Sequence, residues 1–106
     1  MDLAVKIYEN IKILPEEERF CLITQMRRCA VSIPSNIAEG QARNSNKEFY
    51  HFLTISRGSI AELQTQLLIC KRLSYLSELK VNELVKELNE IDRMIIGMMN
   101  FLKTTK

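Results

Sequence analysis

Apolar residues recur at spacings of three and four along most of this chain, a pattern that predicts helices with one buried face. Four such stretches can be traced, over residues 3–14, 15–38, 46–73 and 78–102. The last is the most regular, with apolar positions at Val81, Leu84, Leu88, Ile91, Ile95, Met98 and Leu102. Short connections make sequential helices antiparallel neighbours. We therefore expect an all-α, antiparallel up-down-up-down four-helix bundle that forms a single domain over residues 1–106.

Local signals mark the ends of these helices. Pro15 ends the first helix and opens the second at its first position, where a missing N–H costs nothing. Three glutamates follow at 16–18, where the positive end of the helix dipole favours negative charge. Ser45 and Glu48 form a capping box before the third helix, and Ser77 is expected to cap the fourth.

The second helix contains a proline and a Ser-Asn pair inside an otherwise helical pattern. Pro34 cannot donate to the carbonyl of Ala30 and its ring crowds that carbonyl, at a cost of about 3 kcal/mol, so we expect a kink. Ser32 and Ser35 can satisfy the disturbed backbone, which makes the segment a structural device, and a ligand site is the alternative. In the structural interpretation, Asn36 bonds to a neighbouring helix or subunit.

Two glycines and two glutamates complete this structural motif. Gly40 is expected to end the second helix, after about Ala38. Gly58 lies inside the third helix, where glycine costs about 1 kcal/mol relative to alanine, and we interpret it as a point where another backbone comes close. Glu39 and Glu62 could be buried near Pro34 and Gly58, where they would cap freed backbone groups or pair with Arg28 or Arg57.

Composition favours a helical protein and indicates the cellular compartment in which it is expected. Apolar residues make up 46% of the chain and aromatic residues 7%, with no tryptophan, which argues against a turn-rich β protein. No run approaches a membrane span and the N-terminus lacks the layout of a signal peptide, so we expect no membrane partner. Cys21, Cys29 and Cys70 are odd in number and lack metal-type spacing, which indicates reduced, buried thiols in a cytoplasmic protein.

No local arrangement of residues supports catalysis. Glu48 and His51 have the Glu-x-x-His spacing of helical metal bundles, but such a site needs a second copy of the motif and this chain has one histidine. Cys29 follows two arginines that could lower its pKa, yet a small core or interface thiol is favoured. The sequence therefore predicts no enzyme activity, no catalytic residue, no metal and no cofactor.

Several separated motifs resemble a known family. The chain resembles the small bacterial four helix bundle proteins, first described as encoded by intervening sequences in 23S rRNA genes, through residues 27–40, RRCAVSIPSNIAEG. Residues 22–28, 47–53 and 58–67 match further motifs in the right order, so the resemblance covers nearly the whole chain. Two departures are Cys29, where the family usually has a small residue such as alanine, and a first helix that starts late.

The resemblance implies an assembly and candidate partners. Characterised relatives form homopentamers, rings of bundles around a central channel. In the same superfamily, the accessory proteins of diversity-generating retroelements form basic pentamers that bind nucleic acid and a reverse transcriptase. The last helix agrees with assembly, because Ile96, Met99 and Phe101 lie off its buried stripe and would otherwise be exposed, so we expect them at a subunit contact.

Basic residues supply the case for nucleic acid, although the net charge is only +2. The candidates come from the second helix, the third helix and the loop between them: Arg27, Arg28, Arg43, Lys47 and Arg57. Arginine offers paired donors matched to phosphate oxygens, and a ring would repeat them. We thus expect a non-enzymatic homopentamer with weak, sequence-independent RNA or DNA binding. The alternative is a structural or protein–protein interaction module whose cations pair with its own glutamates.

Overall fold

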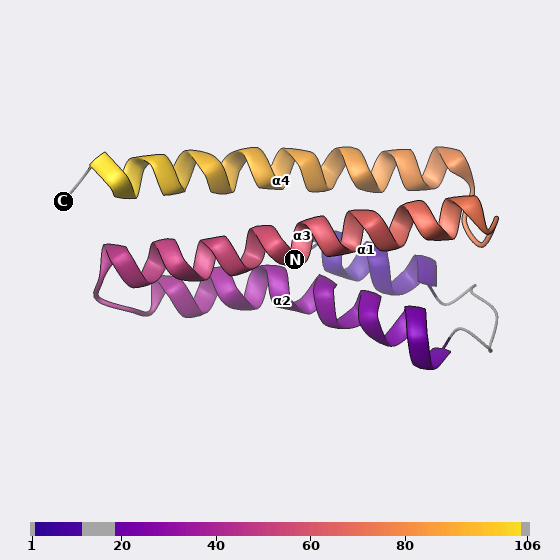
Figure 1. Ribbon diagram of the computed structural model, residues 1–106, viewed down its shortest axis with the longest axis horizontal. Helices are drawn as coiled ribbons and strands as arrows, with labels where there is room; N and C mark the ends of the chain where they lie inside the picture. The colour runs from indigo at the N-terminus through magenta and orange to yellow at the C-terminus, as the bar shows by residue number, and fades with distance from the viewer. Residues whose placement is uncertain (1, 12–18, 105–106) are drawn as a thin grey trace.

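The computed structural model describes residues 2–11 and 19–104. Its α-helices are α1 (Asp2–Ile11), α2 (Thr24–Gln41), α3 (Asn46–Arg72) and α4 (Glu78–Thr104), and a π-helical segment (Arg19–Ile23) leads into α2. The four α-helices alternate in direction along the long axis, and the described residues contain no strand (Figure 1). The predicted all-α, up-down-up-down four-helix bundle is confirmed.

The predicted caps of the last two long helices are present. The N–H of Glu48 donates to Ser45 Oγ over 3.2 Å, with Ser45 in an extended conformation that ends the preceding loop. At the start of α4, the N–H of Lys80 donates to Ser77 Oγ over 3.1 Å. The predicted start of the second helix at Pro15, with its glutamates at 16–18, lies outside the described residues.

Pro34 lies inside a helix that continues past it. Thr24–Gln41 is helical throughout, and Figure 1 shows α2 changing direction part-way along its length, as expected of a helix that contains proline. The predicted end of this helix near Ala38 is wrong by about one turn. Gly40 belongs to the helix and has no positive φ, so it does not act as the expected stop.

Gly40 instead allows α2 to approach α3. A Cβ atom on Gly40 would lie 2.8 Å from Phe49 Cδ1 and 2.9 Å from Phe52 Cβ, closer than carbon atoms can pack. The close approach expected at Gly58 is absent, because a Cβ there would meet nothing within 4 Å among the described residues. The site of close contact is therefore at the end of α2 near the α2–α3 connection.

α3 is the central helix of the bundle. It lies between α2 and α4 in Figure 1, and it packs against both. Its inward positions are fully or almost fully buried over nearly its whole length: Leu53, Ser56, Ser59, Ile60, Leu63, Leu67 and Cys70. Five of these seven residues are apolar, and their burial stabilises the bundle at roughly 25 cal/mol per Å² of apolar surface removed from water.

α1 is much shorter than its neighbours. It has 10 residues where α3 and α4 have 27 each, and it packs against α2 and α4 through Ile7 and Ile11, which are buried. Figure 1 shows α1 beside only the half of the bundle nearer the α3–α4 connection. α1 therefore covers only part of the length of the longer helices.

The two glycines provide a matched test of the α2–α3 contact. Gly40→Ala should lower the free energy of unfolding by about 1–3 kcal/mol, because its methyl group would overlap the Phe49 ring. Gly58→Ala should raise it by about 0.5–1 kcal/mol, because the site is exposed and alanine is the better helix former. Urea denaturation followed by circular dichroism measures both changes. Equal effects of the two substitutions would contradict the assigned contact.

Candidate functional site: a polar seam, a basic end and an apolar stripe

The predicted motif around Pro34 forms a polar seam between α2 and α3. Ser32 Oγ and Ser59 Oγ lie 2.8 Å apart and share a hydrogen bond across the two helices. Asn36 Nδ2 donates to both the carbonyl and the hydroxyl of Ser32, each over 2.9 Å. The contact of Asn36 with the neighbouring helix is therefore indirect, through Ser32, and differs from the direct bond that we expected.

The backbone beside the proline is satisfied from α3. Ser56 is fully buried, and its Oγ donates to the carbonyl of Ile33 over 3.0 Å, immediately before Pro34. Ser35, which we expected to satisfy this backbone, is exposed and lies outside this network. The sequence did not single out Ser56 as a polar partner, because its spacing is that of a core position. The polar groups of the seam are thus bonded to one another within the chain, which favours the structural interpretation of the motif.

Cys29 extends the seam with a thiol that has no sign of reactivity. It is buried, its Sγ donates to Glu62 Oε2 over 3.5 Å, and Gln66 Nε2 donates to the same sulfur over 3.7 Å. Burial, together with the neighbouring Glu62 carboxylate, raises the pKa of the Cys29 thiol. Cys29 is thus a core thiol, as one of the two favoured interpretations has it, and its raised pKa is unlike the lowered pKa of nucleophilic cysteines. Cys70 is buried as well, whereas Cys21 is exposed, which corrects the expectation that all three thiols are buried.

The two glutamates of the motif are exposed, which corrects the expectation that they could be buried. Glu39 Oε1 pairs with Arg43 Nη2 at 2.7 Å, one helical turn further along the chain. Glu62 Oε2 lies 4.0 Å from Arg28 Nη2 at the border of the seam. Both pairs are solvent-exposed, so each contributes at most about 1 kcal/mol.

The five predicted cations do not form one surface. Arg57 forms a bidentate pair with Asp92 of α4, at 2.8 and 3.2 Å, and this contact raises the pKa of Arg57. Arg27 instead stacks over Tyr8 of α1, with its Cζ 5.3 Å from the ring centroid. Together with the Arg28–Glu62 contact, these interactions place three of the five at separate helix contacts. With the Arg43–Glu39 pair, four of the five cations contact a partner within the chain.

The other two cations lie at the end of the bundle formed by the α2–α3 connection. Arg43 stacks over Phe52 at 5.2 Å, and Lys47 borders a hollow whose walls also include Tyr50 and Lys103. Lys103 Nζ is 5.9 Å from the centroid of the Tyr50 ring. We call Arg43, Lys47 and Lys103 the basic end. The sequence did not indicate Lys103 as a candidate, because it lies 56 residues from Lys47 and only the fold brings the two to the same hollow.

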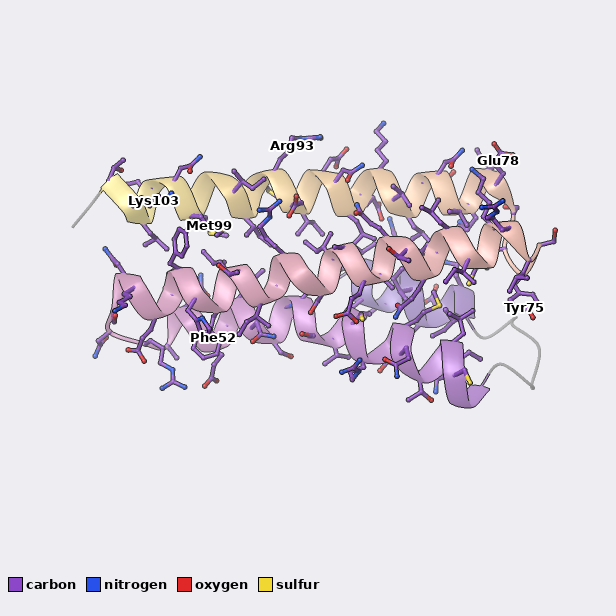
Figure 2. The ribbon with its side chains drawn as sticks, in the orientation of Figure 1. Phe52, Tyr75, Glu78, Arg93, Met99 and Lys103 are labelled. Carbon is purple, nitrogen blue, oxygen red and sulfur yellow. The ribbon has the colours of Figure 1, made fainter. Side chains whose placement is uncertain are left out.

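The expected subunit contact on α4 needs a correction at Met99. Met99 is only 8% exposed and belongs to the core, and Figure 2 shows it pointing from α4 toward α3, whereas Arg93 points away from the bundle. Ile96 is half-buried, so of the three predicted residues only Phe101 is largely exposed, at 64%. Met94 is 63% exposed, and Gly97 lies between it and Phe101. We call Met94, Gly97 and Phe101 the α4 stripe.

The described residues hold no group of three or more histidine, cysteine, aspartate or glutamate side chains that could bind a metal ion. His51 packs edge-on against Phe52, with ring centroids 5.7 Å apart. None of the described helices combines the length and the hydropathy that a membrane span needs.

Comparisons with known proteins agree with this architecture. A crystal structure of a protein of unknown function from the S23 ribosomal protein family of Bacteroides thetaiotaomicron superposes with a TM-score of 0.82 at 24% identity, covering 92% of each chain. A search of curated proteins gave no match. The family described as "23S rRNA-intervening sequence protein" matches residues 1–97. The chain therefore belongs to the 23S rRNA-intervening sequence protein family.

Proposed function

We propose that this protein is a non-enzymatic structural bundle that assembles into a homo-oligomer through the α4 stripe. The observation that carries the proposal is the exposure of Met94 and Phe101 on one helix face, at positions i and i+7 with Gly97 between them. A Cβ on Gly97 would meet nothing within 4 Å among the described residues, so the glycine leaves room for a second backbone.

The distribution of charged residues along α4 indicates that the stripe is an interface rather than a solvated face. Residues 94–102 contain no charged side chain, whereas residues 78–93 of the same helix are rich in lysine and glutamate. The centres of protein interfaces are depleted in charged residues and enriched in methionine and aromatic side chains. A homopentameric ring is the assembly that the family resemblance implies, and in such a ring every copy contributes the same stripe.

Charge placed on the stripe should separate the subunits. Met94→Glu combined with Phe101→Glu should convert the oligomer to monomers, because buried unpaired carboxylates are costly. Size-exclusion chromatography with light scattering at micromolar concentration measures the mass. Leu79→Glu is the matched control, since Leu79 is 72% exposed on the same helix but lies outside the stripe, and it should leave the oligomer intact. A monomeric unmodified protein would refute the proposal.

A second candidate function is weak nucleic-acid binding at the basic end. The observation that favours it is that Lys47, Tyr50 and Lys103 line one hollow, with Lys103 Nζ 5.9 Å from the centroid of the Tyr50 ring. Lysines contact phosphates and an aromatic ring can stack on an unpaired base. One copy offers few phosphate contacts, but a ring would present the basic end once per subunit and gain avidity if the ligand reaches several copies.

Removing the two lysines should weaken this binding. Lys47→Ala with Lys103→Ala should lower affinity for structured RNA and duplex DNA by at least several-fold at low salt. With two fewer cations, the protein neutralises fewer phosphates, so binding releases fewer counterions from the nucleic acid. Fluorescence anisotropy at two salt concentrations measures the effect. The control is Lys80→Ala with Lys86→Ala, which removes the same charge from the other half of α4. Absence of binding by the unmodified protein at tens of micromolar in low salt would eliminate this candidate.

A further inference from the structure

An apolar cavity of about 200 Å³ lies inside the bundle beside α1. Its floor is formed by buried residues of α1, α2 and α3: Ile7, Ala30, Ile33 and Leu63. Its rim is formed by half-exposed residues of α1, α2 and α4: Leu3, Ala4, Pro34, Ile37 and Ile91. The half-exposed rim gives a molecule from solvent a path to the buried floor.

The volume limits what the cavity can hold. An engineered apolar cavity of about 150 Å³ in another protein stays free of water and binds benzene. Pockets for drug-sized ligands are larger, at roughly 300–1,000 Å³. A cavity of about 200 Å³ therefore suits a molecule of one or two fused rings.

The chemistry of the lining limits the ligand further. All of the lining side chains are hydrocarbon, so a charged ligand would lose its hydration without compensation. Any polar contact must come from the backbone. Pro34 has no N–H, so the carbonyl of Ala30 lacks its usual partner four residues ahead, and both residues line the cavity. The neighbouring Ile33 carbonyl already accepts a hydrogen bond from Ser56.

We propose that this cavity binds one small neutral aromatic molecule of one or two rings that carries a single N–H or O–H donor, with the donor directed at the carbonyl of Ala30. The rings fill the hydrocarbon lining and the donor satisfies the acceptor that Pro34 leaves open. The ligand would contact α1, α2 and α4 together, so its binding fastens the short α1 to the bundle. Pro34 thus has a role beyond bending α2, and the inference is independent of the α4 stripe and of the basic end.

Indole and indene separate the two parts of the proposal, because they have nearly the same shape and only indole has an N–H. Isothermal titration of the full chain should give one site per chain for each. Indole should bind about 3- to 10-fold more tightly, as one neutral hydrogen bond predicts. Both should raise the melting temperature of the protein, since a ligand that binds only the folded state stabilises it.

Two variants and one control locate the site. Ala4→Leu places a larger side chain at the rim and should abolish binding of both probes. Pro34→Ala restores the N–H to the Ala30 carbonyl and should remove the advantage of indole while indene still binds. Ala38→Leu, exposed on α2 and outside the cavity lining, should change neither affinity. Circular dichroism checks that each variant is folded.

Three results would overturn the proposal. The first is that neither probe binds the unmodified protein at millimolar concentration. The second is that folded Ala4→Leu binds both probes as tightly as the unmodified protein does, which would place them elsewhere. The third is equal affinity for indole and indene, which would exclude the hydrogen bond to Ala30 and with it the proposed ligand class.

Discussion

Where α2 meets α3, small and polar side chains pack among the large apolar residues of the core. Gly40 lets the helix backbone approach the Phe49 ring, and Ser32 and Ser59 bond to each other across the contact. Each buried hydroxyl therefore has a partner, which spares the desolvation cost of an unpaired polar group. With α2 fixed in this way on one side of α3, other apolar residues of α3 remain available to α4.

The helices could be predicted from the sequence because apolar spacing reports burial directly, whereas details that depend on contacts between distant residues could not. Met99 lies 18 residues after Val81, about five turns of an α-helix, so both side chains face the core. A strict alternation of three- and four-residue spacings instead predicted Met98 as the core residue. Gly40 and Gly58 look alike in sequence, and only the position of the Phe49 ring distinguishes them.

The candidate site was less predictable than the fold, because a cation's role depends on its partner. Arg57 pairs with Asp92, 35 residues away, and Lys47 meets Lys103 only through the antiparallel arrangement of α3 and α4. The surface consequently separates into two parts with different chemistry. The α4 stripe suits contact between copies of the chain, and the basic end suits an anionic polymer, so the two proposed functions do not compete for the same residues.

The hydrogen bonds of the seam and the close contact at Gly40 lead us to infer that α2 and α3 form one cooperative unit, to which the short α1 is added. Native-state hydrogen exchange followed by NMR measures the opening free energy of each helix separately. Amides of α2 after Pro34 and amides of α3 around Ser56 should share the highest opening free energy, while those of α1 should open at lower cost. Exchange of α2 as rapid as that of α1, with α3 and α4 still protected, would contradict the account.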